Sequence, residues 1–402
     1  MGKEKTKKGS GSKGLAGAIS GGERPWIQVL AQMHDHTMIL AEVPAKKFYY
    51  DANAIVDAMA DVTGYYDFDM FNPFADLYNY EIEAMGAKMI YGENSMPTID
   101  FREPLIKNPE DLTKLKAKEV DWRNDGRLPY VLGCIELSLE YGSNLGMFCS
   151  PFSMAVGMRS FPALIKDMRK RPQFAHELFT FITDDVLLPY LKVQNEVCDI
   201  LIAVGADAWA CVPNLSVKDM KEWVVPYNER LLEKAKKIGV MAMNVSGDYC
   251  EERLEKFDAN VLHGCFDVEI ASQGAPSLFL GMGRWQDYPL EPVLDYLAKY
   301  REQGINASII ATLNARLIRD GPVEKIISAV KRIIDAFARE HSVQFLFGNL
   351  PADAPSDHIH AGIAAVHTYG RYPIADNLDD IELKIPKRES FKEWKQKISK
   401  NQ

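Results

Sequence analysis

Residues 207–246, DAWACVPNLSVKDMKEWVVPYNERLLEKAKKIGVMAMNVS, contain one complete strand–helix–strand unit. The apolar runs 207–212 and 240–246 predict strands, and the amphipathic stretch 217–237 between them predicts a helix. A helix that connects two successive strands is typical of a parallel sheet, because the chain must cross over before it can run again in the same direction. The unit therefore indicates an α/β protein.

The same alternation of strand and helix recurs along the chain from residue 24 onward. Eight or more such units favour a (β/α)8 TIM barrel with an N-terminal flexible extension over a doubly wound sheet. Because nine candidate strands compete for eight places in a barrel, we expect one to lie outside it. The candidate strands are residues 26–32, 68–73, 145–151, 207–212, 240–246, 260–267, 277–283, 308–313 and 343–348, and the clearest helical stretches are 161–195, 217–237, 290–303, 323–340 and 357–369.

The composition divides the chain into three parts. Residues 1–22 are rich in Lys, Gly and Ser, which predicts a flexible leader, either as a solvated tail or as a contact for an acidic partner. Residues 23–375 form the predicted barrel domain, since 402 residues with 47% hydrophobic content can bury a large core. Residues 376–402 are highly charged, and we expect this C-terminal extension to pack on the outside of the barrel.

Charge and cysteine usage exclude several classes of protein. The net charge of −9 disfavours binding to nucleic acid, and no apolar run reaches the roughly 18–20 residues that a membrane-spanning helix requires. The six cysteines are scattered without a disulfide framework, which is typical of reduced thiols in a cytoplasmic protein. We therefore expect a cytoplasmic enzyme without a nucleic-acid or membrane partner, with a homodimer as a candidate assembly.

The active site of a TIM barrel lies at the C-terminal ends of its strands. The stretch QMHDHTM, residues 32–38, places His34, Asp35 and His36 directly after the first candidate strand. The two imidazoles would share one face if the strand continued, and they are candidates for general acid–base catalysis or for a metal pair. The alternative interpretation is a hydrogen-bonded strand end at the rim of the barrel.

The stretch VLHGCFDVE, residues 261–269, raises the question of a metal site. If residues 260–267 are a strand, His263, Cys265 and Asp267 lie on one face, and zinc accepts all three of these ligand types. Cys250, a short distance upstream, is a candidate third ligand. The alternative is a buried pair, because cysteine often behaves as a small hydrophobic residue.

Further candidate site residues follow other strands. Asp76, in NPFADLY, is placed to orient a substrate or deliver a proton, or else to cap the next helix. Arg316, in TLNARLIRDGP, would hold a carboxylate or phosphate, or form a surface ion pair. Arg284 and Trp285 offer a cation beside a flat apolar surface, which suits an aromatic ligand or a packed loop.

Four stretches resemble segments of the uroporphyrinogen decarboxylase superfamily, in the same order and over roughly residues 24–370. The resemblance implies a single (β/α)8 barrel. The stretches are FDMFNPFADLYNYEIEAMGAKMIYGE (68–93), MFCSPFSMAVGMRSFPALIKDMRKRPQFAHELF (147–179), DAWACVPNLSVKDMKEWVVPYNERLLEKAKKIG (207–239) and FGNLPADAPSDHIHAGIAAVHTYG (347–370).

The chain departs from two functional branches of that superfamily. Asp76 matches the aspartate of the decarboxylases. The position of their tyrosine, however, falls near Gly157, and that of their late histidine falls at Gly348. Few cations are available to bind a polycarboxylate substrate. The branch that methylates thiols carries a zinc-binding His-x-Cys-Gly after its fifth strand and a late cysteine. In this chain the place of the His-x-Cys-Gly motif reads Asn244-Val-Ser-Gly. The place of the late cysteine is taken by Gly348.

The remaining branch takes a methyl group from a donor such as an aryl methyl ether and passes it to cob(I)alamin on a corrinoid protein. The resemblance therefore implies a corrinoid-dependent methyltransferase, an O-demethylase, with cobalamin carried by the partner and zinc as a further candidate cofactor. The rivals are a decarboxylase and a non-catalytic protein that binds a corrinoid or a methyl donor. The expected catalytic residues are His34, His36 and Asp76, the expected substrate-binding residues are Asn244, Asp248, Trp285, Asn314 and Arg316, and the candidate metal ligands are His263 and Cys265.

Overall fold

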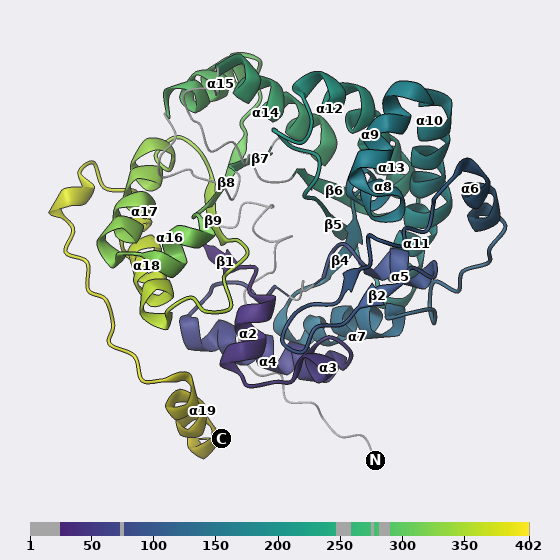
Figure 1. Cartoon of the computed structure of the whole chain (residues 1–402). Helices are drawn as coiled ribbons and strands as arrows, with labels where there is room; N and C mark the ends of the chain where they lie inside the picture. The colour runs from purple at the N-terminus through teal and green to yellow at the C-terminus, as the bar shows by residue number, and fades with distance from the viewer. Residues whose placement is uncertain (1–24, 73–75, 247–258, 275–276, 281–289, 402) are drawn as a thin grey trace.

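The computed structural model describes residues 25–72, 76–246, 259–274, 277–280 and 290–401. Parallel strands lie around the middle of the molecule in two sheets, and helices surround them on the outside (Figure 1). This arrangement confirms an α/β fold with parallel pairing. One sheet has the order β1 (Val29–Ala31), β9 (Val343–Phe347), β8 (Ser308–Thr312) and β7 (Ser277–Leu280), and the other has the order β4 (Leu145–Cys149), β5 (Ile202–Asp207) and β6 (Met241–Ser246).

Helices connect the strands that follow one another along the chain. The predicted helix at 217–237 is divided at Val224, because Pro226 has no N–H to donate to the preceding turn. The described helices are α2 (His34–Leu40), α3 (Ala45–Phe48), α4 (Ala52–Tyr66), α5 (Tyr80–Ala84), α6 (Pro109–Lys116), α7 (Leu128–Ser138), α8 (Pro151–Arg159), α9 (Phe161–Lys170), α10 (Pro172–Phe181), the π-helical η2 (Ile182–Leu187), α11 (Leu188–Cys198), α12 (Val217–Trp223), α13 (Val225–Lys237), α14 (Ala259–Gln273), α15 (Glu291–Glu302), α16 (Ala315–Asp320), α17 (Val323–Phe337), α18 (Ser356–Tyr369) and α19 (Phe391–Asn401), with short 3-10 helices η1 (Leu139–Tyr141) and η4 (Leu378–Asp380).

Two of the predicted strands are wrong. The strand expected at 207–212 is β5, which begins five residues earlier and ends at Asp207, where the chain turns. The strand expected at 260–267 is part of α14. Leu262, Cys265, Phe266 and Glu269 are buried in that helix at the spacing i, i+3, i+4, i+7, which is the helical rather than the strand period.

The segment 68–72 runs beside β1 without forming a regular strand. The Asp69 N–H donates to the Val29 carbonyl at 2.9 Å, and the Asn72 side-chain amide donates to the Ala31 carbonyl at 2.9 Å. The Asp69 carboxylate accepts from the Val29 N–H at 2.8 Å. A side chain therefore replaces part of the backbone ladder. The strand expected at 68–73 is not formed along 68–72, which is a third departure from the prediction, and residue 73 lies outside the described residues.

The outer edge of β4 is paired with side chains. The Gln194 side-chain amide accepts from the Met147 N–H at 2.9 Å and donates to the Met147 carbonyl at 2.8 Å. Glu81 accepts from the Cys149 N–H at 2.7 Å. Since buried backbone groups require partners, these side chains take the place of a neighbouring strand along β4.

One face of the sheet β4–β5–β6 packs against helices. Asn244 of β6 lies beside Gly205 of β5, and its amide donates to the Ser272 carbonyl of α14 at 3.2 Å. A Cβ added at Gly205 would lie 2.4 Å from the ring of Phe148, so this packing leaves no room for a side chain. Because strand residues two apart share a face, Asp207 also belongs to this helix-facing side.

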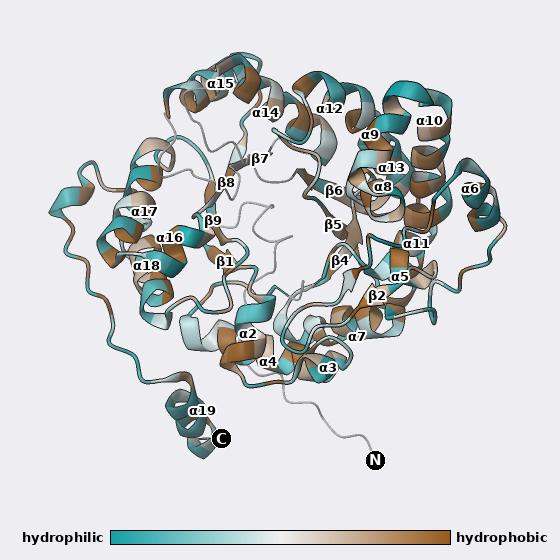
Figure 2. Cartoon of the chain, in the orientation of Figure 1, coloured by the Kyte–Doolittle hydropathy of each residue, from teal (hydrophilic) through white to brown (hydrophobic). Residues whose placement is uncertain are grey.

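The opposite, inner face is apolar, and part of it is only half-buried. In β5 it carries Val204 and Ala206, and in β6 it carries Val245. In the other sheet Leu30 of β1 pairs with Leu346 of β9, and both are half-buried between fully buried neighbours. Figure 2 shows that the strands around the middle of the molecule consist largely of hydrophobic residues.

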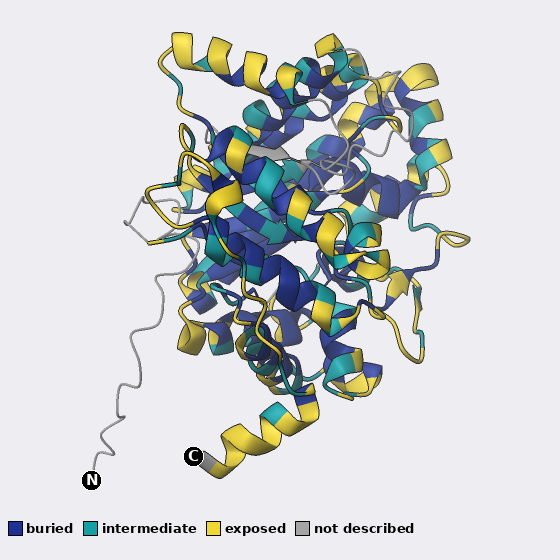
Figure 3. Cartoon of the chain, turned by 90° about the vertical axis from the view of Figure 1, so that its left-hand side faces the viewer, coloured by how far each residue is buried: buried dark blue, intermediate teal, exposed yellow. Residues whose placement is uncertain are grey.

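The C-terminal residues cross α17 and α18 and end in α19, which packs against α4. The rings of Phe391 and Trp394 lie 5.3 and 5.7 Å from the ring of Tyr65, and the Tyr65 hydroxyl donates to the Glu389 carbonyl at 2.9 Å. The rest of α19 is mostly exposed, at one end of the molecule (Figure 3). Of the helices in the described parts of the chain, none combines the length and the apolar character that crossing a bilayer requires.

Candidate functional site

Polar side chains gather after the C-terminal ends of β1, of the segment 68–72 and of β4. α2 follows β1, the stretch 76–84 follows the segment 68–72, and α8 follows β4. The Cys149 N–H at the end of β4 donates to Glu81, which brings the stretch 76–84 to that end of the strand. We call His34, Asp35, Asp76, Glu81 and Glu83 the acid cluster. Arg127, at the beginning of α7, joins it from a distant part of the chain.

His34 is the first residue of α2. Its Nδ1 accepts a hydrogen bond from the Asp35 N–H at 3.0 Å, which favours the neutral tautomer with the proton on Nε2. Burial lowers the pKa of His34, while the negative charges of Asp35 and Asp76 act to raise it. The predicted catalytic residues His34 and Asp76 therefore lie close enough to influence each other.

Asp35 is held by a neighbouring tyrosine. The Tyr49 hydroxyl donates a short hydrogen bond to the Asp35 carboxylate. Burial and this carboxylate together raise the pKa of Tyr49 above its usual range. Tyr49 therefore remains a neutral donor beside Asp35.

Asp76 is fully buried and accepts three hydrogen bonds. Its donors are Arg127 Nη2 at 2.9 Å, the Asn79 amide at 2.6 Å and the Tyr78 N–H at 3.2 Å. Burial raises the pKa of Asp76, and the Arg127 charge opposes that effect. The following helix α5 begins after Asn79, so Asp76 does not cap it.

Arg127 is 3% exposed and connects two carboxylates. Its Nε donates to Glu83 at 2.6 Å, and its guanidinium carbon lies 4.7 Å from the ring centre of Tyr80 and 5.5 Å from that of Tyr50. Its third nitrogen, Nη1, is buried without a hydrogen-bond partner among the described residues. That atom remains able to donate to an acceptor oxygen.

Glu81 holds a carboxyl oxygen without a partner. Its Oε1 accepts from the Cys149 N–H at 2.7 Å, and its Oε2 is buried without a partner in the described part of the chain. Burial raises the pKa of Glu81 to about 7, with the Asp76 charge acting in the same direction. A carboxyl with this pKa carries a proton in a large fraction of molecules at neutral pH.

Asp207 is a second buried acid, at the end of β5. Its Oδ1 accepts from the Ser153 N–H at 2.9 Å and from the Ser153 hydroxyl at 2.6 Å, both in the first turn of α8. Burial raises the pKa of Asp207 to about 7. Because it lies on the helix-facing side, Asp207 fixes α8 to β5 rather than facing the middle of the molecule.

His36 lies apart from the acid cluster. Its Nδ1 is 3.0 Å from the Pro351 carbonyl oxygen and its Nε2 is 2.8 Å from the Tyr66 hydroxyl, which is in turn 2.9 Å from the Ser356 hydroxyl. Residues 34 and 36 lie in a helix rather than a strand, so their side chains do not share a face. The expected face shared by His34 and His36 is therefore wrong, and both ring nitrogens of His36 are occupied in packing.

The predicted substrate-binding residues are not brought together among the described residues. Asn244 faces α14, as described above, and its Oδ1 is buried without a partner in the described chain. Asn314 caps α16 by accepting from the Arg316 N–H at 2.8 Å, and the Arg316 side chain is exposed. Asp248 and Trp285 lie outside the described residues.

The candidate metal ligands His263 and Cys265 lie in α14. His263 Nε2 is 2.7 Å from the Pro292 carbonyl oxygen, and Cys265 is buried. Because α14 is a helix, residues two apart do not share a face, and the geometric argument for zinc does not hold. Within the described ranges, no group of three His, Cys, Asp or Glu side chains is arranged to hold a metal ion. Cys250 lies outside the described residues.

Comparison with known proteins places the chain in a family. The profile of the family described as uroporphyrinogen decarboxylase (URO-D) matches residues 25–369. The chain belongs to the URO-D family. This family assignment confirms the resemblance read from the sequence, and the acid cluster lies within the matched region.

Solved structures support the same fold. A methyltransferase from Methanosarcina mazei superposes with a TM-score of 0.63 at 15% sequence identity, over 87% of this chain and 96% of that one. At this identity the likeness establishes the fold of the URO-D protein. No curated protein sequence matches the chain significantly.

Two residues of the site were missed by sequence reasoning. Arg127 lies 51 positions from Asp76, and a buried arginine has no local signal in a sequence. Glu81 was contained in the stretch that resembles the family, but nothing near it indicated that it pairs with β4. The neighbouring Glu83-Ala-Met-Gly was the part of that stretch that carried the resemblance.

Proposed function

We propose that this protein transfers a methyl group from a small O-methylated aromatic substrate to cob(I)alamin carried by a partner corrinoid protein. The observation that carries the proposal is Glu81, a buried carboxyl with a pKa of about 7 and a free oxygen, located beside Asp76. Membership of the URO-D family and the similarity in fold to a methyltransferase are consistent with it.

The proposed reaction requires a proton rather than a nucleophile from the enzyme. The bond between the methyl carbon and the oxygen breaks, the methyl group passes to the corrinoid, and the released oxygen takes a proton. Reduced cobalt in the corrinoid supplies the electron pair that attacks the methyl group. An acid with a pKa near the working pH is the most efficient donor for this proton, and Glu81 meets that requirement.

The other members of the acid cluster would support the proton donor. His34 would relay a proton through Nε2, since its Nδ1 is an acceptor of the Asp35 N–H. Asp76 would hold Arg127, and the free Nη1 of Arg127 would donate to an oxygen of the substrate. His36, the third residue expected to be catalytic, would hold α2 in place through its contacts with Pro351 and Tyr66.

The inner face of the strands suits an aromatic ring. Val204, Ala206, Leu30 and Leu346 present half-buried apolar side chains there, and an aryl ring or the edge of a corrin macrocycle would bury this surface. The corrinoid protein would dock over the C-terminal ends of the strands, because the methyl group must reach cobalt directly.

We also propose that the two sheets belong to one (β/α)8 barrel. The URO-D family implies this fold, and the false strand at 260–267 removes the ninth candidate. The seven parallel strands of the described residues and the irregular segment 68–72 would then fill eight places. A barrel would bring the acid cluster and the inner face to the same opening.

A decarboxylase is less consistent with the acid cluster. Arg127, the cation beside the acid cluster, is already paired with Asp76 and Glu83. With Glu81 included, the acid cluster therefore carries more acidic than basic groups. A substrate with several carboxylates would be repelled by that arrangement. A non-catalytic binding protein would have no use for the proton of Glu81.

The proposal is tested by anaerobic incubation with cob(I)alamin, free and on a corrinoid protein, and a panel of methoxybenzenes, methylamines, methanol and methyl thiols. Loss of the Co(I) absorbance with a methoxybenzene is the expected result. Turnover with methylamines or thiols alone would overturn the assignment of an O-methyl donor. No turnover with a competent partner would overturn methyl transfer itself.

A further inference from the structure

A cavity of about 440 Å³ lies between α19 and the end of α2. One wall is formed by Leu40, Ala41 and Glu42, and the other by α19. Ligand cavities in proteins have volumes of roughly 300–1,000 Å³, so the space is large enough for a small organic molecule. The residues of α19 that line it are Phe391, Lys392, Lys395, Gln396, Ser399 and Lys400.

The cavity exists because only part of α19 is anchored to the rest of the protein. Phe391 and Trp394 pack against Tyr65 of α4, and Lys395 forms an ion pair with Asp61 of the same helix at 2.6 Å. The lining positions recur at intervals of three and four residues and therefore form one stripe of α19. This stripe shares Phe391 and Lys395 with the contacts to α4 and faces the end of α2.

The charges around the cavity are predominantly positive. Lys392, Lys395 and Lys400 line it, against the single carboxylate of Glu42. Asp61 neutralises Lys395, but no described carboxylate lies within 4.0 Å of the ammonium groups of Lys392 or Lys400. Two lysines are thus available to a ligand, which would gain from the proximity of both charges.

The apolar part of the lining lies beside these charges. Phe391 is 7% exposed, and Leu40 is half-buried and packs against the core. A ligand with an apolar body could cover these side chains while its head group contacted the ammonium groups. Such a mixture of apolar wall and convergent polar groups is typical of sites for small amphipathic molecules.

We propose that this cavity binds a small amphipathic anion, with an apolar body against Leu40 and Phe391 and an anionic head group at Lys392 and Lys400. The family match ends at residue 369, so one wall of the cavity, α19, lies outside the URO-D region, while the wall of Leu40, Ala41 and Glu42 lies within it. The site is also separate from the acid cluster. It shares only α2, which begins at His34 and ends at Leu40.

The proposal is tested by titration calorimetry of the full chain with octanoate, octyl phosphate and octylammonium. Octanoate and octyl phosphate share the anionic head and the apolar body, and they distinguish a carboxylate ligand from a phosphate. We expect saturable binding of at least one of these anions, weakened by added salt, and no binding of octylammonium. Binding of octylammonium as tight as that of both anions, or of none of the three, would overturn the proposal.

Substitutions locate the site. The double variant Lys392→Gln/Lys400→Gln should raise the Kd of the anion about tenfold, since each exposed charge pair contributes up to about 1 kcal/mol. The matched control is Lys397→Gln, which lies on the same helix outside the lining and should leave the Kd unchanged. Equal affinity of the double variant and the control, with thermal unfolding unchanged in both, would place the bound anion elsewhere and contradict the assignment.

Discussion

The Arg127 guanidinium donates a hydrogen bond to the Asp76 carboxylate, with Nη2 2.9 Å from Oδ2, and both side chains are almost fully buried. The pair connects the start of α7 with the stretch that follows the irregular segment 68–72. Glu83 is bound by the same guanidinium at 2.6 Å. One arginine therefore fixes two carboxylates of the acid cluster in place.

Replacement of Arg127 should destabilise the protein strongly. Arg127→Ala leaves Asp76 buried without its partner and should lower the free energy of unfolding by about 3–5 kcal/mol. The measurement is equilibrium unfolding in urea. The matched control is Arg123→Ala, whose surface ion pair with Glu196 contributes at most about 1 kcal/mol. A similar loss in both variants would contradict the role of the buried pair.

The two buried acids should make stability depend on pH. Burial raises the pKa of Glu81 and Asp207 to about 7, from reference values of 4.5 and 3.8. Between these values the folded protein holds protons that the unfolded chain has released. The stabilisation is therefore fully present below about pH 4 and is lost as pH rises through about 7, by about 3 kcal/mol for Glu81 and about 4 kcal/mol for Asp207.

Neutral variants isolate this effect. Glu81→Gln and Asp207→Asn should each flatten the decline in the free energy of unfolding between pH 4.5 and 8, measured by urea unfolding at several pH values. The control is Asp57→Asn on the exposed face of α4, which should leave the decline unchanged. A decline of equal slope in all three variants and the natural chain would refute the assigned protonation of both acids.

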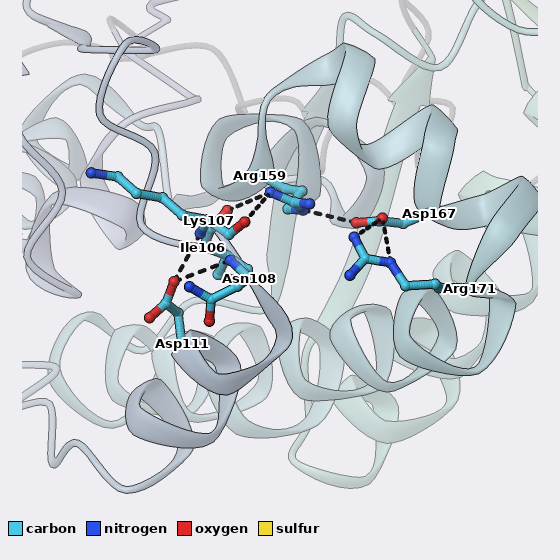
Figure 4. A network of polar contacts seen from close by, with 7 residues as sticks. All are labelled: Ile106, Lys107, Asn108, Asp111, Arg159, Asp167 and Arg171. Carbon is cyan, nitrogen blue, oxygen red and sulfur yellow. Dashed lines mark hydrogen bonds and ion pairs between the residues drawn. The ribbon is translucent and has the colours of Figure 1, made fainter.

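A buried ion pair also fixes the helices after β4. Asp167 of α9 is fully buried and accepts from Arg159 Nε of α8 at 2.8 Å, and Arg159 Nη1 donates to the Ile106 carbonyl at 2.9 Å (Figure 4). Arg171, before α10, donates to the same carboxylate. Asp167→Ala should lower the free energy of unfolding by about 3–5 kcal/mol in urea unfolding, because two arginines lose their partner.

An exposed carboxylate of similar geometry provides the comparison for Asp167. Asp335, in the last turn of α17, accepts from Arg339 just beyond the helix at 2.8 Å in an i,i+4 pair, with 61% of its side chain exposed. Asp335→Ala should cost less than about 1 kcal/mol. If both alanine variants lost the same small amount, burial would not be the source of the stabilisation.

The cysteine thiols should be unreactive in the folded protein. Five of the six, at 134, 149, 198, 211 and 265, are buried, and burial raises the pKa of Cys149 well above its usual range. Since the thiolate is the reactive form, we expect at most one thiol to react rapidly with Ellman's reagent in native conditions and six to react in denaturant. Rapid reaction of two or more native thiols would contradict the burial of these residues.

Much of the fold could be predicted from the period of the apolar residues. The strand at 240–246 and the helices at 290–303 and 323–340 were recognisable, because long amphipathic stretches between short apolar runs have few other interpretations. The stretch 260–267 was misread, since its short apolar run fits a strand or a buried helix equally. The sequence predicted β5 five residues too far along the chain, because residues 208–212, AWACV, are also apolar.

The candidate site could be predicted only where its residues follow strands directly. The sequence predicted His34 and Asp76 in this way and the structure places them near each other, while their catalytic role stays a prediction. Arg127 and Glu81 were not, because their roles depend on contacts with Asp76 and Cys149 that only the folded chain brings together. The sequence predicted that His34 and His36 share one face of a strand, and likewise His263 and Cys265. Both predictions were wrong because both pairs lie in helices.

Substitution of Glu81 should reduce methyl transfer. If Glu81 donates the proton, Glu81→Gln lowers the rate by about 10²–10⁴-fold. The natural enzyme should be fastest below about pH 7 and slow as Glu81 loses its proton above that value, whereas the variant should lose this dependence. A structural role would leave the pH profile unchanged, so rates are measured from pH 5.5 to 9 with Asp57→Asn as the control.

The central claim is tested most directly by following the methyl group itself. The protein is incubated anaerobically with cob(I)alamin on its carrier protein and each of a series of methoxybenzenes that carry a CD₃ group on oxygen. Mass spectrometry then measures the label on the corrinoid and the phenol released. We predict equal amounts of CD₃-labelled corrinoid and phenol with at least one donor. Phenol without labelled corrinoid, or neither product with any donor, would contradict the proposed methyl transfer.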